Sequence, residues 1–154
     1  RTPFLRHSQR HDRVSVLSAL SLSPGRRHCG LYFRCQLNVN FHASEVVLCL
    51  RDLLRHLRGP VIVLLDNATI HRGPLVAALR QRHPRLHLVY FPSYAPELNP
   101  AEGIWGRAKT ELANGQPPDG AHLLRDVTRS LTRLARSQPH LRGCITHALS
   151  IRLP

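Results

Sequence analysis

The stretch VIVLLDNATIH, residues 61–71, joins an unbroken aliphatic run to polar side chains. An aliphatic run as short as residues 61–65 is typical of a central strand that is buried on both faces of a sheet. Asp66 follows the run directly, and ligands in open α/β sheets bind at the carboxyl ends of strands. The sequence therefore predicts a strand that ends in a functional aspartate, although an Asx turn or a helix cap would also explain Asp66.

The residues on either side of this strand predict a sheet with helices packed against it. Further strands are expected over residues 13–22, 31–39 and 85–91. Helices are expected over residues 43–57, 73–82, 100–113 and 119–136. A hairpin followed by β-α-β units indicates an α/β fold with a mixed sheet, in a single domain over residues 1–154.

A second stretch, FPSYAPELNPAEGIW at residues 91–105, is stiffened by three prolines before a helix begins. Asn99 is placed to be the N-cap of this helix and Glu102 falls at its N3 position, so a capping box would account for both side chains. The cap does not account for Pro92 and Pro96, which restrict the backbone over the whole approach. A rigid approach also determines where the Glu102 carboxylate points, as a metal ligand requires.

The two carboxylates are expected to meet at one edge of the sheet, Asp66 from a strand end and Glu102 from a helix start. Carboxylate oxygens are the ligands that Mg²⁺ and Mn²⁺ prefer in proteins. A pair of divalent ions held by acids is the arrangement that cleaves and rejoins phosphodiester bonds. Asp66 and Glu102 therefore predict an enzyme that acts on nucleic acid.

The net charge of +13 points to the same partner, because a charge of this size favours an anionic ligand. Lys109 is the single lysine, and a GC-rich genome would explain that preference for arginine, but it explains the deficit of acids less well. In residues 119–136 an arginine stripe lies opposite an apolar face, and it is either the solvated back of a helix or a phosphate-contacting ridge. The candidate DNA contacts are Arg107, Lys109, Arg125, Arg129 and Arg133.

Other features narrow the class of protein. The four cysteines lack the spacing of a zinc site, so we expect free thiols in a reducing cytoplasm. The sequence has neither an apolar run of the roughly 20 residues that span a bilayer nor a secretory signal at its start. The chain begins with Arg1 and contains no methionine, so we interpret it as a piece of a longer protein.

Together the two stretches resemble the DDE transposases of the bacterial insertion-sequence and mariner superfamily. The first matches an aliphatic strand ending in Asp-Asn-x-x-x-His, through Asp66, Asn67 and His71. The second matches a Leu-Pro-x-Tyr-x-Pro-x-Leu-Asn-Pro-x-Glu-x-x-Trp element, with Phe91 in place of the leucine. The matching positions are Pro92, Tyr94, Pro96, Leu98, Asn99, Pro100, Glu102 and Trp105.

The resemblance implies a ribonuclease H-like fold in which three acids, Asp, Asp and Glu, hold two Mg²⁺ or Mn²⁺ ions. Asp66 corresponds to the second acid and Glu102 to the third, so the proline-rich segment would aim a metal ligand. One ion would activate water or a DNA 3′-hydroxyl, and the other would stabilise the leaving oxygen. We interpret Trp105 as a packing anchor rather than a base-stacking residue, whereas Asn67 and His71 are either structural or substrate-contacting. The implied partners are transposon-end and target DNA, with a homodimer assembled on DNA in the bacterial nucleoid.

The sequence departs from the family pattern at the first acid, which belongs on a first strand ahead of residues 13–22. Asp12 is the only acid before Glu45 and precedes that strand instead of lying within it. We therefore expect a fold without its first strand, and a chain that is marginally stable and inactive by itself. The alternative function is that of a non-catalytic nucleic-acid-binding remnant of a decayed mobile element.

Overall fold

A computed structural model describes residues 12–25, 28–93, 95–113, 115, 117–151 and 153. It is a mixed α/β fold in which each predicted strand and helix is found, with ends that differ by up to two residues. The order is β1 (Val14–Leu22), β2 (Cys29–Leu37), α1 (Ala43–His56), β3 (Val61–Leu65), η1 (Thr69–His71), α2 (Pro74–Arg82), β4 (Leu86–Tyr90), η2 (Pro96–Leu98), α3 (Pro100–Leu112), α4 (Gly120–Ala135) and α5 (Gln138–Leu149). None of the helices in these described ranges is long and apolar enough to cross a membrane.

The strands form two separate pairs, and the prediction of one mixed sheet is wrong for the described residues. β1 and β2 pair antiparallel from Val14 opposite Leu37 to Leu22 opposite Cys29. β3 and β4 pair parallel, joined through α2 as a β-α-β unit. The residues that the structure describes include no strand between the two pairs, so β1 and β3 each keep one edge without a ladder partner.

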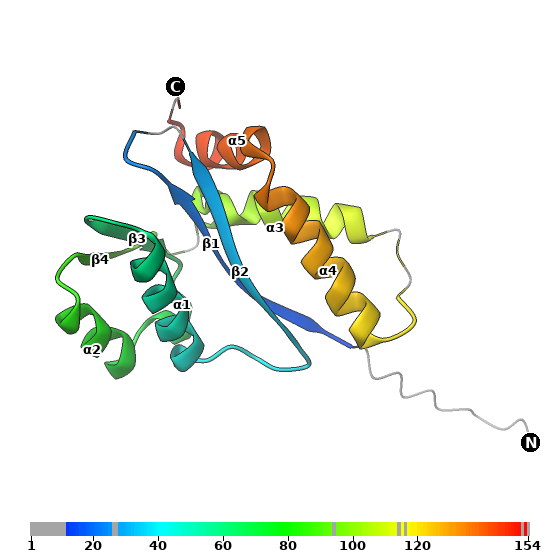
Figure 1. Ribbon diagram of the computed structural model, residues 1–154, viewed down its shortest axis with the longest axis horizontal. Coiled ribbons are helices and arrows are strands. Elements are labelled where there is room, and N and C mark those ends of the chain that lie inside the picture. The colour runs from blue at the N-terminus through cyan, green and yellow to red at the C-terminus, as the bar shows by residue number, and fades with distance from the viewer. Residues whose placement is uncertain are drawn as a thin grey trace, which may run out of the picture.

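The hairpin β1–β2 separates two hydrophobic cores, as Figure 1 shows by the helices on either side of it. Successive residues of a strand point to opposite faces. Val16 and Leu20 accordingly face α3, α4 and α5, whereas Leu17 and Ala19 face α1. The first core is centred on the fully buried side chains of Cys29, Ile104, Leu131 and Leu141.

Helix α1 holds the two strand pairs together, because its apolar stripe packs on both of them. The buried stripe consists of Val46, Leu50, Leu53 and Leu54, in the i, i+3, i+4 pattern that the sequence predicts. The guanidinium of Arg85 lies at the C-terminal end of this helix, where it donates hydrogen bonds to the backbone carbonyls of Leu54, Leu57 and Gly59. These contacts set the position of β3 and therefore of the residues that follow it.

The β3–β4 pair is covered on one face only, which corrects the prediction that β3 is buried on both. Val61 and Leu86 pack against α1 and α2, and Leu65 is buried as well. On the other face Ile62 is 68% exposed, Leu64 42% and Val89 47%. The aliphatic run predicts burial on both faces because it has no polar side, but the described chain supplies no layer for the second face.

Candidate active site

Asp66 stands at the carboxyl end of β3 with one carboxylate oxygen engaged and one available. Oδ1 accepts a hydrogen bond from the backbone N–H of Ala68 at 3.0 Å, which is the Asx turn that the sequence allows. The same oxygen lies 2.7 Å from Nδ1 of His71. The other oxygen has no partner among the described residues, and the side chain is 53% exposed. The turn therefore orients the Asp66 carboxylate and leaves its second oxygen available.

His71 is the buried side chain that positions Asp66. It ends η1, is 9% exposed, and its Nδ1 also lies 3.4 Å from the backbone carbonyl of Asp66. The hydroxyl of Tyr90 donates to the backbone carbonyl of His71 at 2.9 Å. Arg72 in turn places its guanidinium 4.6 Å from the centre of the Tyr90 ring. The end of β4 thus supports the imidazole that faces Asp66.

Asn67 joins the end of β3 to the start of the proline-rich segment. Its amide nitrogen donates to the carbonyl of Phe91 at 2.7 Å, and its amide oxygen accepts from Arg72. The N–H of Phe91 donates to the carbonyl of Leu65 at 2.8 Å, which continues the β3–β4 ladder by one bond. The asparagine of the first motif therefore holds the residue at which the second motif begins.

Glu102 lies in the first turn of α3, and the predicted capping box is not formed. The side chain of Asn99 caps the helix by accepting from the N–H of Ala101 at 3.1 Å. The N–H of Asn99, which a capping box would offer to Glu102, donates instead to the carbonyl of Pro96 at 2.9 Å. In the described part of the chain the exposed carboxylate of Glu102 has no hydrogen-bond or ion-pair partner.

Helix α1 provides the contrasting case, because its N3 glutamate does complete the box. Glu45 accepts from the N–H of His42 at 2.8 Å, and this bond is the first cause that lowers the pKa of Glu45. In α3 the corresponding N–H is that of Asn99, and the turn η2 engages it, so it is not available to Glu102. The prolines therefore do more than start the helix: they leave its first carboxylate available.

A cleft of about 540 Å³ opens beside Glu102, between the start of α3 and the helix α5. Glu97, His140, Cys144 and His147 share its lining with Glu102. The thiol of Cys144 lies 3.8 Å from Nε2 of His140, and burial raises the pKa of this thiol, so it stays protonated at neutral pH. Asp66 is not among the residues that line this cleft. Sequence reasoning missed the α5 residues because nothing in their spacing predicts contact with α3.

The remaining predicted residues lie in several different surroundings. Trp105 is half-buried against the first core, the place of a packing anchor. Arg107 pairs with Glu111 at 3.4 Å, and Lys109 is exposed on the same helix. Tyr94 lies outside the described residues. The exposed arginines Arg125, Arg129 and Arg133 lie on α4.

Asp12 is placed away from both motif acids, at the entry to β1. Its Oδ1 accepts from the side-chain amide of Asn38 at 2.8 Å. Its carboxylate also lies against Gly120 at the start of α4, where an added Cβ would come within 2.7 Å of Oδ2.

The carboxylates of Asp66 and Glu102 offer the kind of donor atom that a divalent metal binds. Exposed carboxylate oxygens of Asp66 and Glu102 are the ligands that Mg²⁺ and Mn²⁺ favour. Within the ranges that the structure describes, however, no group of three or more His, Cys, Asp or Glu side chains is arranged to hold a metal ion.

Comparison with protein families identifies the chain. The family model described as DDE superfamily endonuclease matches residues 1–124, and the chain belongs to this family. The family generally uses divalent metals, acts on nucleic acid and has activity of the nuclease or transposase type. Comparison with curated proteins found no match. The matched range contains both motif acids, whereas α5 and most of α4 lie beyond it.

Proposed function

We propose that this chain is the catalytic part of a DDE transposase, which cleaves phosphodiester bonds at transposon ends and joins the strands to target DNA. The observation that carries the proposal is the carboxylate of Glu102, held at the end of a rigid segment with no partner in the described chain. The free oxygen of Asp66 supports it, because a metal ligand must be oriented and still have a lone pair to give.

The fold proposed for the whole catalytic unit is ribonuclease H-like, with one more strand between β1 and β3. Two observations support this arrangement: both strands have an edge without a ladder partner, and both strand pairs pack on α1. Unpaired edges are costly when buried and prone to aggregation when exposed. A strand in that position would satisfy both edges, and an aspartate on it would be the third ligand.

Each chain residue has a part in the proposed reaction. Asp66 and Glu102 would hold two divalent ions, which when bound activate the attacking oxygen and stabilise the leaving one. His71 and the Ala68 N–H hold the Asp66 carboxylate in one orientation. Asn67 keeps β3 aligned with the segment that leads to Glu102. Assembly as a dimer on DNA belongs to the same proposal.

The test is a cleavage and joining assay on DNA that carries the element's ends, with Mg²⁺ or Mn²⁺. We expect no cleavage by the 154-residue chain, and metal-dependent cleavage once residues encoded upstream of Arg1 are added to it. Asp66→Asn and Glu102→Gln should each abolish that activity. Glu97→Gln is the matched control, because Glu97 lines the same cleft as Glu102 but is not a motif acid. Equal loss in all three variants would contradict the roles assigned to Asp66 and Glu102.

The alternative, a nucleic-acid-binding remnant without catalysis, is favoured by two observations. The described residues provide no three-ligand cluster, and their two strand pairs do not join into one sheet. Both functions predict DNA binding that weakens with salt, so binding does not separate them. The extended chain does: if it binds DNA but never cleaves it with either metal, the remnant is the correct function.

A further inference from the structure

The outward surface of α4 carries four arginines around an open groove of about 660 Å³. We call this surface the α4 arginine face; its residues are Leu124, Arg125, Thr128, Arg129, Thr132, Arg133 and Arg136. The side chains of Arg129 and Arg133 are 81% and 67% exposed. Most of this face lies beyond residue 124, the last position matched by the family model. Neither of the two acid motifs includes it.

The orientation of α4 is set by its buried side, so the arginine face cannot turn inward. Val127, Leu131 and Leu134 are buried in the first core. The hydroxyl of Ser130 donates to Glu111 of α3 at 2.6 Å. A basic amphipathic helix can bind a membrane only by inserting its apolar side. Since that side of α4 is already packed, the exposed face offers charge and little else.

The charge on this face is only partly neutralised. Arg129 lies 3.7 Å from Asp126, and Arg133 forms an ion pair with Glu111. In the described part of the molecule, Arg125 and Arg136 have no carboxylate partner. Arginines that served only to stabilise the helix would be expected to pair with acids three or four positions away. The guanidinium groups of Arg125 and Arg136, which have no carboxylate partner in the described residues, lie beside those of Arg129 and Arg133. Together the four groups form a site for an extended anion.

The spacing of the arginines suits a polymer of phosphates. Arg125, Arg129 and Arg133 follow one another at four-residue intervals, so they span about 12 Å along the helix. One strand of duplex DNA presents a phosphate about every 3.4 Å along its axis, so this length covers three or four phosphates. A small anion would need only one or two of these groups.

We propose that the α4 arginine face binds the backbone of duplex DNA without regard to sequence, at a place separate from the acids. Glu102 and Glu111 are nine positions apart on α3, or about two and a half turns, so they lie on opposite sides of that helix. The cleft beside Glu102 and the contact of α4 with Glu111 are therefore on different sides. The face would hold a flanking length of DNA rather than the bond to be cut. This inference rests on the proposed function for its choice of DNA.

The experiment measures the affinity of the 154-residue chain for a blunt DNA duplex by fluorescence anisotropy, in EDTA and over a range of salt. The variant Arg125→Gln/Arg129→Gln/Arg136→Gln removes three charges but leaves the Arg133–Glu111 pair intact. We expect a loss of affinity of about tenfold or more, and a plot of log K against log salt that is shallower by about 2 to 3. Each neutralised phosphate contact contributes about 0.9 to that slope.

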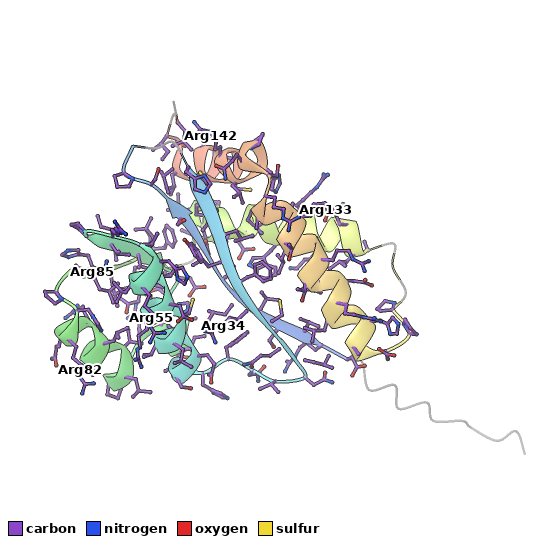
Figure 2. All side chains as sticks on the ribbon, in the orientation of Figure 1. Arg34, Arg55, Arg82, Arg85, Arg133 and Arg142 are labelled. Atoms are coloured by element: carbon purple, nitrogen blue, oxygen red, sulfur yellow. The ribbon has the colours of Figure 1, made fainter. Side chains whose placement is uncertain are left out.

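The matched control removes the same charge elsewhere, as Arg58→Gln/Arg80→Gln/Arg82→Gln. These three exposed arginines lie after α1 and on α2; Figure 2 labels Arg82 beside α2 and Arg133 beside α4, on opposite sides of the hairpin. The control should keep most of the slope and affinity. Equal losses in both triple variants would show that net charge alone drives binding and would overturn the proposal. Unchanged binding by the α4 variant would overturn it as well.

Further measurements test whether this surface is responsible for the binding. If the triple variant does not fold, Arg125→Gln and Arg136→Gln are tested singly, since neither arginine has a carboxylate partner to lose; a slope unchanged in both would overturn the proposal. Cleavage that depends on Asp66 together with α4 variants that bind normally would refute this inference and leave the proposed function standing. Binding that depends on α4, with no cleavage by the extended chain, would support this inference and contradict the proposed function.

Discussion

The polar side chains of the two motifs divide into those that offer an oxygen and those that hold the backbone. Asp66 and Glu102 each keep at least one carboxylate oxygen without a partner in the described chain. The side chains of His71, Asn67 and Asn99 instead contact neighbouring groups, at the end of β3 and at the start of α3. Of the motif side chains named here, Asp66 and Glu102 therefore keep an oxygen that a metal could bind, and the other three stabilise the local backbone.

The His71–Asp66 contact can be measured with a double-mutant cycle of His71→Phe and Asp66→Ala. Phenylalanine retains the ring volume of the buried histidine but cannot donate to Asp66. We expect a coupling energy of about 1 kcal/mol in the free energy of unfolding, the usual net value of a hydrogen bond. Urea unfolding of the four proteins gives the result. Losses that simply add, within about 0.4 kcal/mol, would mean that the contact does not orient Asp66.

Glu111 predicts a pH dependence of stability. The hydrogen bond from Ser130, and then that from Arg133, lower the pKa of Glu111 from its ordinary value of 4.5. A carboxyl whose pKa is lower in the folded state stabilises the fold above its unfolded pKa, and this contribution is lost as pH falls through the folded value. The free energy of unfolding should therefore decrease below about pH 4.5.

The variant Glu111→Gln should lack that part of the acid dependence. Its free energy of unfolding is expected to be lower than that of the unaltered chain at pH 7, with a difference that narrows as the pH falls below about 4.5. The pKa values of Glu45, Asp52 and Asp119 are also lowered, so the comparison between the two proteins isolates Glu111. A difference that is constant from pH 7 to pH 3, followed by circular dichroism, would contradict the assignment.

At the scale of elements, the contact between α3 and α5 decides the surroundings of Glu102. Gly103 allows this contact, because a Cβ at this position would lie 2.8 Å from Sγ of Cys144 and 3.4 Å from its Cβ. The helices can approach so closely only where the side chain is absent. A glycine next to a candidate ligand is therefore what permits α5 to form one wall of the cleft.

Replacing the two glycines of α3 separately tests this contact. Gly103→Ala should destabilise the fold by about 1 to 3 kcal/mol, because the Cβ overpacks the interface with α5. Gly106→Ala is the matched control: it lies in the same helix, its Cβ would meet nothing within 4 Å, and it should stabilise the fold by about 0.4 to 1 kcal/mol. Thermal and urea unfolding give both values. Stabilisation by both changes would show that α5 does not pack at Gly103.

At the scale of the whole molecule, the β3–β4 pair exposes an apolar surface to solvent. Ile62 and Leu64 lie on one face of β3, and Val89 is the partner of Leu64 in the register with β4. This surface lies beside the unpaired edge of β3, and such edges favour association with other chains. We therefore expect the isolated chain to self-associate through the β3–β4 pair.

The double variant Ile62→Thr/Val89→Thr should reduce that self-association. Threonine keeps the branched shape that suits a strand but removes apolar surface from an already exposed face. The weight-average mass in sedimentation equilibrium should fall toward that of the 17.4 kDa chain, without a lower melting temperature. The same change at the exposed Leu48 and Leu75, which lie on helices, is the control. If the control reduces the mass equally, the strand surface is not the cause.

Local patterns in the sequence were sufficient to predict the helices and strands, and they single out Asp66 and Glu102 as candidate ligands. Alternation along β1, the heptad-like stripe of α1 and the proline at the start of α3 act within a few residues, so their consequences can be read in order along the chain. At the margin of the apolar face of α4, Leu123 packs against the core, whereas the next residue, Leu124, lies beside the arginines. Neighbouring positions on a helix differ by about 100°, so a face assignment at its margin depends on what packs there.

Only the tertiary structure decided which of these residues meet. The release of Glu102 from its capping box depends on η2, and the wall of its cleft comes from α5, at contacts that no spacing rule predicts. The support of Asp66 by His71 requires the hydroxyl of Tyr90 from the neighbouring strand. The exposure of one face of β3 was likewise hidden, because an aliphatic run looks the same whether or not a layer covers both of its faces. Sequence patterns are local, whereas a site and a sheet are made by segments that the fold brings together.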